Sequence, residues 1–324
     1  MSIDEPTPHP EKTKSVSRQE MARHTRRSFL IGGIAAAAVF GAYDWLDHAP
    51  RIGELRTPLR DALRFNAALS RALFSNRQLA PAYPSSRLTG LRLNNDVGLN
   101  TDMLLDSWRL QVVGLENPRQ YPQFIEDVAL WKYRSKGGNS PLAQPSDGNS
   151  GSDSKSITMH PIEIHQTLNI PLAPPSDKTR IPGIVLSMTD LRKLPFTEQI
   201  TQFKCIEGWS QITSFGGLRF ADFVKAYPPA RHPDGSYPRY VLMETANGLF
   251  SSAFDFADML HPQTMLCYKM HGQSLTPGHG APLRLATPFH YGYKQIKQIA
   301  RLTYTDKRPL DYWSRRGYDW YAGL

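Results

Sequence analysis

Cysteine is scarce in this sequence, which holds only Cys205 and Cys267 among its 324 residues. At most one disulfide is therefore possible, and it would be optional, because a chain of this length buries enough apolar surface to fold without one. The Cys-x-x-Cys-His motif that attaches haem is also missing, so this chain carries no c-type haem of its own.

Long runs of basic residues are missing as well, although the formal net charge is +9. Outside the N-terminus no run of Lys and Arg is longer than three residues, and no zinc-finger or RNA-binding signature occurs. These absences argue against a nucleic-acid partner, and an anionic cofactor or substrate explains the positive charge better. Hydrophobic residues make up 40% of the chain, which predicts a packed core.

The first 50 residues have the features of a targeting sequence. Thr25-Arg26-Arg27-Ser28-Phe29-Leu30 overlaps the start of an uncharged run of 16 residues from Ser28 to Tyr43. Paired arginines followed by an apolar run are typical of a twin-arginine export signal, which implies a periplasmic location. Since aromatic residues crowd the expected cleavage positions, an uncleaved N-terminal membrane anchor is the alternative, although the run is short for a span.

The remaining chain is predicted to be α+β, with residues 51–90 as a helical and loop lead-in and 91–324 as the main domain. The 23 glycines and 26 prolines favour many turns, and no regular βαβ alternation is visible. Residues 131–180 resemble an insertion, and 137–156, with 16 Gly, Ser, Pro, Asn or Asp in 20 positions, are expected to be a disordered loop. Helices are expected over 51–78, 220–226 and 255–260, and strands over 108–113, 240–245, 264–270, 283–286 and 298–304.

The segment Phe203-Lys204-Cys205-Ile206-Glu207-Gly208-Trp209-Ser210 contains the candidate metal ligand. A thiolate is a natural ligand for a soft, high-valent metal, and the basic Lys204 next to Cys205 is expected to favour deprotonation. Glu207 and Trp209 are candidates for a supporting hydrogen bond and a rigid wall. The alternative is a buried structural cysteine beside a turn, which is the role expected for Cys267 within its apolar strand.

A second segment, from Met270 to Lys297, has the residues of an anion site. The glycines at 278 and 280 allow close backbone approach to a ligand. Arg284 offers a bidentate fork for a phosphate, Lys297 a point charge, and His279 a further donor. Each residue also has an ordinary structural explanation when it is taken singly.

Together, Cys-x-Glu-x-Trp-Ser at 205–210, His-Gly-Ala-Pro-x-Arg at 279–284 and Tyr-Gly-x-Lys-x-x-Lys at 291–297 resemble the molybdopterin domain of the sulfite oxidase family. The resemblance runs from about Asn94 to the C-terminus, apart from the insertion. It implies the sulfite-oxidase-type molybdopterin-binding fold, with mixed β-sheets and short helices. Only 20 residues follow Tyr304, so no C-terminal immunoglobulin-like domain is expected.

Within that family the sequence is most similar to the bacterial periplasmic catalytic subunits that reduce methionine sulfoxide in proteins. The resemblance implies a molybdenum–molybdopterin cofactor with Cys205 as the metal ligand and catalytic residue. It also implies that Arg284 binds the pterin phosphate and that the Gln295-Ile296-Lys297 turn cradles the cofactor. The full set of implied cofactor-binding residues is Asn94, Val97, Gly98, Thr245, His279, Arg284, Gln295, Ile296 and Lys297.

Two departures from the reductase pattern leave the substrate open. Asp96-Val97-Gly98 stands where the reductases have aromatic and acidic residues, so contacts at Val97 and Gly98 would come from the backbone. His279 stands where the reductases have Asn and sulfite oxidases have His. The resemblance implies oxygen-atom transfer from a small-molecule or protein-bound sulfoxide, by a monomeric catalytic subunit that receives electrons from a membrane haem protein or another separate donor. The alternatives are oxidation of sulfite or a related oxyanion, and a non-catalytic exported binding or scaffold protein.

Overall fold

A computed structural model describes residues 38–52, 55–73, 79–93, 96–136 and 180–324. The chain divides into two compact units, of which the first holds residues 1–52 and 56–58 and the second holds 53–55 and 59–324. Residues 38–48 of the first unit are helical. The paired arginines of the predicted signal and the predicted loop 137–156 lie outside the described residues. Within the described ranges, no helix combines the length and apolar character that crossing a membrane requires.

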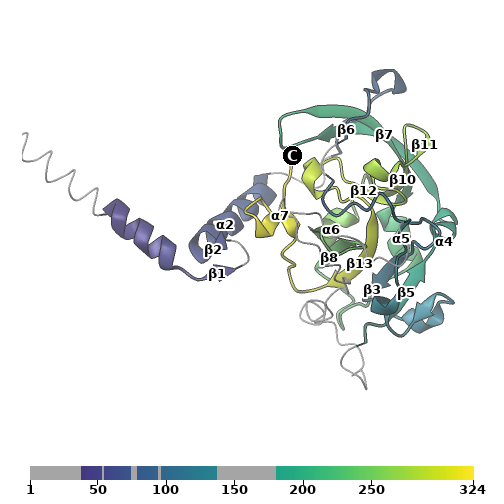
Figure 1. Ribbon diagram of the computed structural model, residues 1–324, viewed down its shortest axis with the longest axis horizontal. Helices are drawn as coiled ribbons and strands as arrows, with labels where there is room; N and C mark the ends of the chain where they lie inside the picture. The colour runs from purple at the N-terminus through teal and green to yellow at the C-terminus, as the bar shows by residue number, and fades with distance from the viewer. Residues whose placement is uncertain (1–37, 53–54, 74–78, 94–95, 137–179) are drawn as a thin grey trace, which may run out of the picture. The chain divides into compact units, whose positions relative to one another are not determined.

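The second unit is built mainly from short strands, with few and mostly short helices (Figure 1). The strands are β1 (Arg51–Ile52), whose residues belong to the first unit, β2 (Leu55–Arg56), β3 (Leu110–Val113), β4 (Phe124–Ile125), β5 (Gly183–Leu186), β6 (Phe196–Lys204), β7 (Ser210–Arg219), β8 (Tyr240–Thr245), β9 (Ser251–Asp255), β10 (Met265–Met270), β11 (Gln273–Ser274), β12 (Arg284–Ala286) and β13 (Ile299–Thr305). The helices are α2 (Thr57–Leu73), α4 (Met188–Arg192), α5 (Phe220–Ala226), α6 (Phe256–Met259) and α7 (Tyr312–Arg315), with short 3-10 turns between strands.

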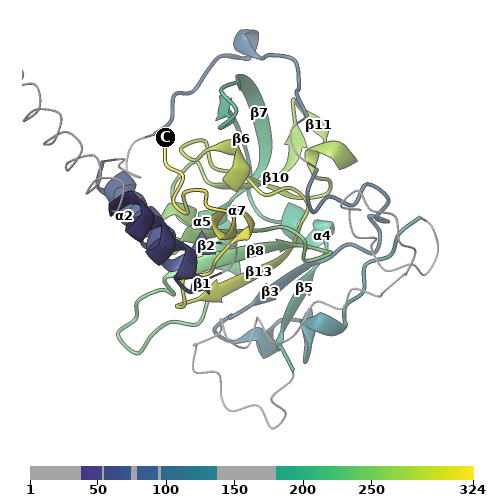
Figure 2. The ribbon, with the colours of Figure 1, turned by 60° about the vertical axis from the view of Figure 1, so that its left-hand side comes forward.

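Two sheets make up the domain. One has six strands in the order β4-β5-β3-β13-β8-β9, and the other has the order β11-β10-β7-β6 with β12 also paired to β10. Figure 2 shows β3, β5, β8 and β13 side by side, apart from β6, β7, β10 and β11. Strands β13 and β3 run parallel, so the six-stranded sheet is mixed, whereas all pairs of the other sheet are antiparallel. The α+β prediction is confirmed.

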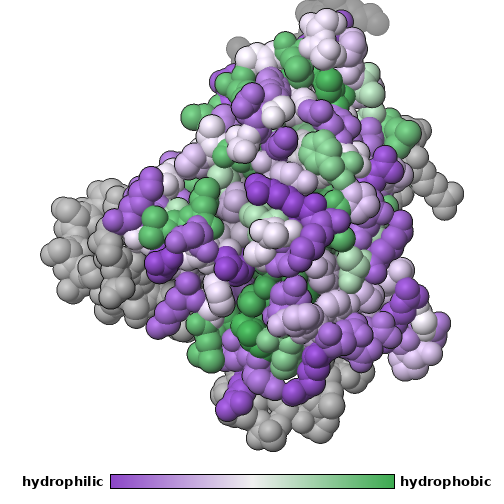
Figure 3. All heavy atoms as spheres, turned by 90° about the vertical axis from the view of Figure 1, so that its right-hand side faces the viewer, coloured by the Kyte–Doolittle hydropathy of each residue, from purple (hydrophilic) through white to green (hydrophobic). Residues whose placement is uncertain are grey.

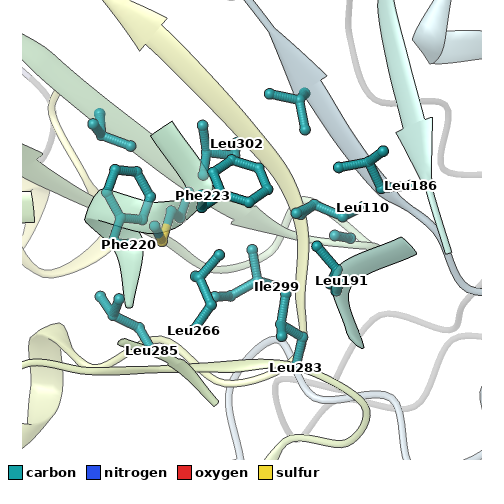
Figure 4. Packing of buried hydrophobic residues seen from close by; sticks show 14 of the residues in the cluster. Leu110, Leu186, Leu191, Phe220, Phe223, Leu266, Leu283, Leu285, Ile299 and Leu302 are labelled. Atoms are coloured by element: carbon teal, nitrogen blue, oxygen red, sulfur yellow. The ribbon is translucent and has the colours of Figure 1, made fainter. Parts of the chain in front are cut away.

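The main core lies where the two sheets and the short helices meet (Figure 4). Val112, Val241 and Leu302 from the six-stranded sheet pack in one cluster with Leu218 and Leu266 from the other sheet. Because successive side chains of a strand alternate between faces, the strand neighbours of these core residues point away from this core. On the face in Figure 3, polar side chains are interspersed with smaller apolar groups, as on an ordinary solvated surface.

Most of the predicted elements are present. The strand at 240–245 and the helix at 220–226 have the predicted bounds, and the other predicted strands and the helix at 255–260 lie within one or two residues of theirs. The first helix begins at Thr57 rather than at residue 51, because β1 and β2 occupy positions before it and Pro58 suits the first helical turn. The long β6–β7 hairpin was not predicted, since residues such as Glu198 and Thr213 interrupt any apolar run.

Gly217 provides a test of the sheet packing. It lies opposite Cys267 in the β7–β10 pair, where an added Cβ would stand 2.1 Å from the Leu266 carbonyl oxygen and 2.7 Å from the Cys267 Cα. Backbone atoms cannot rotate away, so we expect Gly217→Ala to lower the free energy of unfolding by about 1–3 kcal/mol. Urea unfolding of Gly217→Ala and of Gly90→Ala, whose Cβ meets nothing within 4 Å, checks this. Equal stability of the two variants would show that the sheets are not packed in this way.

Candidate active site

Cys205 lies in the turn of the β6–β7 hairpin, at the end of the longest pair of strands in the described chain. Its N–H donates to the Trp209 carbonyl at 2.9 Å, and the Gly208 N–H donates to the Cys205 carbonyl at 3.2 Å. Gly208 has a φ of 87°, a left-handed conformation that glycine adopts without strain. The turn therefore fixes the backbone of the cysteine while its side chain stays only half-buried.

An aromatic wall supports this turn. The Trp209 ring stacks on Phe203 with centroids 5.7 Å apart, and its Nε1–H donates to a Glu207 carboxylate oxygen at 2.9 Å. The Arg92 guanidinium lies 4.5 Å from the centroid of the same indole. Glu207 and Trp209, which were predicted to support Cys205, thus form a hydrogen bond with each other, and this bond holds the indole in place. Arg92, which the sequence prediction missed, adds a positive charge beside it.

The prediction that Lys204 favours deprotonation of Cys205 is wrong. Burial is the main cause that raises the pKa of the Cys205 thiol, and the Glu207 carboxylate raises it further. Lys204 is exposed and does not contribute to the shift. Binding of a metal to this sulfur must therefore displace a proton. Among the described residues, no group of three or more His, Cys, Asp or Glu gathers in a way that would hold a metal.

The second cysteine has a different environment, as predicted. Cys267 is fully buried in β10, and burial raises the pKa of its thiol to about 12. It belongs to an apolar cluster with Phe203, Phe215 and Ala281, and Cys205 packs against the edge of that cluster. Cys267 is therefore a small core residue, whereas Cys205 stands at the border between core and solvent.

Three basic side chains from the second predicted segment meet in one place, which we name the cation cradle: His279, Arg284 and Lys297. Arg284 is 2% exposed, and its Nη1 donates to the His279 carbonyl at 3.1 Å. The Lys297 ammonium donates to the Gly278 carbonyl at 3.1 Å. The left-handed Gly280 makes the approach possible, since a Cβ there would stand 2.6 Å from the Cβ of Lys297.

The charges of the cation cradle are poorly compensated. Burial, followed by the Arg284 charge, lowers the pKa of Lys297 to about 7, and Asp96 opposes the shift. Burial also lowers the pKa of Arg284 to about 10, and burial together with the two cations lowers the pKa of His279. Such shifts indicate positive groups held together without enough negative charge.

Orphaned polar atoms point to the same conclusion. Arg284 Nε and His279 Nε2 are both buried and have no hydrogen-bond partner among the described residues. Buried donors are normally paired, so an acceptor-rich anion is the group that fits here. A pterin phosphate satisfies both the charge and the hydrogen bonds of the cradle. The residues present therefore fit a molybdopterin cofactor.

The cation cradle is joined to the thiol turn through the apolar cluster. The Arg284 guanidinium lies 5.1 Å from the centroid of the Phe215 ring, and Phe215 belongs to the cluster against which Cys205 packs. Strand pairing enforces this arrangement, because Cys267 of β10 lies opposite Gly217 of β7 on one side and Arg284 of β12 on the other.

A further pair of predicted residues lies together at the end of β8. Gly98, with a φ of 78°, approaches Thr245 so closely that a Cβ would stand 3.0 Å from the threonine hydroxyl. That hydroxyl donates to Asn247 Oδ1 at 2.8 Å and accepts from the Phe250 N–H at 3.2 Å. The Thr245 side chain thus closes its own turn, and Gly98 supplies backbone beside it.

The remaining predicted residues differ in what their side chains do. Gln295 donates to the carbonyls of Thr287 and His290, both at 3.2 Å, so its side chain supports the turn from the interior. Ile296 is buried in the main core, and Val97 packs against that core. Of Gln295 and Ile296, only backbone atoms therefore remain for a ligand. Asn94 lies outside the described residues.

Gln298 is a connecting residue that the sequence analysis missed. Its Oε1 accepts from the Asn100 N–H at 2.6 Å, and its Nε2 donates to the Asn100 carbonyl at 2.9 Å and to the Ala281 carbonyl at 3.1 Å. It thereby ties segment 96–100 to the cation cradle, near the point where Asp96 influences Lys297. Its position directly after Lys297 was the one feature of the sequence that could have indicated this role.

Comparison with known proteins identifies the class. Residues 178–313 match the family model described as the oxidoreductase molybdopterin binding domain. This part of the chain is thus similar to a molybdopterin-binding oxidoreductase domain. Its cofactor is the molybdenum–molybdopterin group that the sequence resemblance implies.

Two curated relatives are named as methionine-sulfoxide reductase subunits. A protein of Azospira oryzae named as protein-methionine-sulfoxide reductase subunit YedZ1 is 34% identical over 137 residues, 42% of this chain and 50% of that protein. The protein-methionine-sulfoxide reductase catalytic subunit MsrP of Campylobacter jejuni is 28% identical over 159 residues, 44% of this chain and 52% of that protein. The match thus spans about half the length of each relative.

Among solved structures, the sulfane dehydrogenase SoxCD of Paracoccus pantotrophus matches with a TM-score of 0.35 and 19% identity, over 40% of this chain and 36% of that one.

The two thiols are expected to differ in reactivity. In cofactor-free protein at neutral pH, Cys205 reacts with iodoacetamide because it is half-buried, while Cys267 stays unmodified because it is fully buried with a pKa of about 12. Loading with the cofactor then protects Cys205. Peptide mass spectrometry of both forms measures this, and modification of Cys267 ahead of Cys205 would contradict the arrangement.

Lys297 is expected to make stability depend on pH in cofactor-free protein. Its folded pKa of about 7 lies below the ordinary lysine value of 10.5, so the unfolded chain binds more protons between these values. Stability therefore rises as pH increases through this window. Lys297→Met removes that rise, whereas Lys225→Met at an exposed lysine retains it. Melting temperatures across the window check this, and identical pH profiles for wild type and Lys297→Met would refute it.

Proposed function

We propose that the protein is an exported molybdenum-cofactor oxidoreductase that reduces a sulfoxide, of the methionine-sulfoxide type, by oxygen-atom transfer. The observation that carries the proposal is the half-buried Cys205 thiol, held at a fixed turn and joined by one apolar cluster to a buried cation cradle with orphaned donors. The names of the two curated relatives support the substrate class.

The roles of the protein's own residues follow from their surroundings. When bound, the molybdenum cofactor supplies the two-electron oxygen-atom transfer. Cys205 would supply a thiolate ligand to the metal from a turn whose backbone is fixed. Arg284 and Lys297 would hold the phosphate of the pterin, with His279 as a further donor. Thr245 and Gly98 would offer closely packed backbone to the cofactor.

The cavity next to the thiol turn supports a neutral substrate. It has a volume of about 520 Å³ and is lined by Ile206, which directly follows Cys205, and by Tyr291, Tyr293 and Tyr318. Its charged side chains are one arginine and one aspartate, so the wall carries no net formal charge. A sulfoxide with an apolar side chain suits such a wall, whereas the sulfite dianion is better bound by a positive one.

Export and the electron partner are part of the proposal. The paired arginines at 26–27 and the apolar run after them support passage by the twin-arginine route to the periplasm, with membrane anchoring as a variant of that route. The chain has no Cys-x-x-Cys-His motif, which supports a separate electron donor, a membrane haem protein above all. The catalytic subunit is proposed to act as a monomer.

Replacement of the ligand tests the proposal. Cys205→Ser is expected to keep the fold and lose essentially all turnover, since a hydroxyl is a poor ligand for a soft metal. Cys267→Ala serves as control because it removes the buried thiol away from the turn. Molybdenum content by mass spectrometry, and reduction of methionine sulfoxide by a reduced dye, are measured for both variants and the wild type.

The possible outcomes separate the alternatives. If the wild-type protein oxidises sulfite but leaves methionine sulfoxide unchanged, the proposed substrate is wrong and the proposed cofactor site still stands. Protein that carries no molybdenum after export would indicate a binding or scaffold protein. Full turnover in Cys205→Ser would refute the role of this cysteine.

A further inference from the structure

A second cavity, of about 720 Å³, lies against the face of the six-stranded sheet that points away from the main core. Leu242 and Glu244 of β8 and Thr303 of β13 form its floor, and Thr303 lies opposite Leu242 in the strand register. Thr245, next to Glu244, packs instead on Gly98. Since neighbouring residues of a strand point to opposite faces, this cavity and the Thr245–Gly98 contact lie on opposite faces of the sheet.

The walls of this cavity are strongly positive. Helix α2 and the chain from 307 to 320 supply them, and Glu244 is the one carboxylate among the lining residues. That carboxylate already lies 3.9 Å from the buried guanidinium of Arg301. The six cationic lining residues are Arg60, Arg64, Lys307, Arg308, Arg315 and Arg316. The cavity therefore has a large excess of positive charge.

Three of these arginines contact backbone carbonyls or an aromatic ring. Arg60, only 3% exposed, donates to the Ser314 carbonyl at 3.3 Å, and Arg315 donates to the Leu310 carbonyl at 2.9 Å. Arg308 lies 4.3 Å from the centroid of the Trp320 ring. Carbonyls and rings orient a guanidinium without neutralising its charge. Arg64 contacts the Asp61 carboxylate at 3.0 Å.

A buried hydroxyl in the floor points to a ligand as well. Thr303 is 1% exposed, and its Oγ1 has no hydrogen-bond partner among the described residues. Buried hydroxyls are normally paired, so a ligand acceptor in the cavity would supply the missing bond. Burial and the charges of Arg64 and Arg315 also lower the pKa of Arg60, as expected where an anion is needed. Leu63, Leu249 and Leu310 add apolar wall beside the charges.

We propose that this cavity binds a phosphoryl group that carries an apolar substituent. Several guanidinium forks around one space favour a multiply charged oxyanion over a single carboxylate. The volume is within the range of small-molecule sites, and the leucines accommodate the apolar part. An anionic lipid headgroup and a soluble phosphorylated metabolite share this chemistry. Arg316 and Tyr318 line both this cavity and the one beside Cys205, whereas Arg308 and Thr303 line only this one.

Pyrophosphate binding to the cofactor-loaded full chain tests the proposal by calorimetry. In that form the cation cradle is occupied, so it does not compete for the probe. Arg308→Gln is expected to weaken binding by about tenfold or more, because one charged fork is lost from the cavity. The matched control is Arg231→Gln, since Arg231 also lies 4.3 Å over a ring, that of Tyr237, but on an exposed surface elsewhere. Binding to the control is expected to equal that of the wild type.

Two further measurements decide the remaining outcomes. Thr303→Val keeps every charge and nearly the same shape, and it is expected to weaken binding several-fold even if Arg308→Gln fails to fold. Co-sedimentation with phosphatidylglycerol vesicles, and with phosphatidylcholine vesicles as control, identifies the source. Binding to the anionic vesicles that pyrophosphate displaces indicates a lipid headgroup, and pyrophosphate binding alone indicates a soluble ligand.

The proposal is overturned if the loaded protein binds neither pyrophosphate nor phosphatidylglycerol vesicles. It is also overturned if Arg308→Gln and Arg231→Gln weaken binding equally, since that result indicates diffuse attraction to a basic surface. Sulfoxide turnover is expected to stay unchanged in Arg308→Gln. Loss of phosphoryl binding therefore tests this cavity alone, and turnover tests the proposed reaction alone.

Discussion

Strand β10 holds the two halves of the candidate site together. It pairs with β7, whose hairpin turn presents Cys205, and with β12, which begins at Arg284. Cys267 lies between them in the register, opposite Gly217 and Arg284, and leaves room for nothing larger than glycine on one side. Because three strands are fixed to one another by backbone hydrogen bonds, the thiol turn and the buried guanidinium keep a constant relation.

Charge is distributed in a way that stability alone does not explain. The domain buries Arg284 and most of Lys297 close together, with Asp96 as the opposing charge, and this arrangement costs free energy until an anion arrives. A bound phosphate reverses the sign of that contribution, because the same cations then attract it in a dry environment. Cofactor binding and folding are therefore expected to support each other in this domain.

The sequence predicted the elements with strong apolar patterns and missed those without them. Strands such as β8 and β13 were recognisable because they are short and apolar between turns. The β6–β7 hairpin is polar along much of its length, and its stability comes from pairing with β10, which no local pattern reveals. The place of Cys205 at a hairpin turn was consequently unknown from the sequence.

The site residues were found through short motifs, and their side-chain roles needed coordinates. Gln295 was predicted to meet the cofactor through its backbone, and the coordinates show that its side-chain amide is engaged by two interior carbonyls. Lys204 seemed suited to activate the thiol by adjacency, but neighbouring residues of an extended chain point apart. Lys294 of the same motif pairs with Asp311 in the interior, which makes it structural. The phosphoryl cavity could not be predicted from the sequence, because its arginines come from separate parts of the chain.

An anomalous difference map, recorded at the molybdenum absorption edge from crystals of the loaded protein, tests the central claim most directly. The account predicts a single metal peak at bonding distance from the Cys205 sulfur, with the pterin phosphate in contact with Arg284 and Lys297. A metal peak remote from the β6–β7 turn, or a phosphate bound away from those two cations, would contradict it.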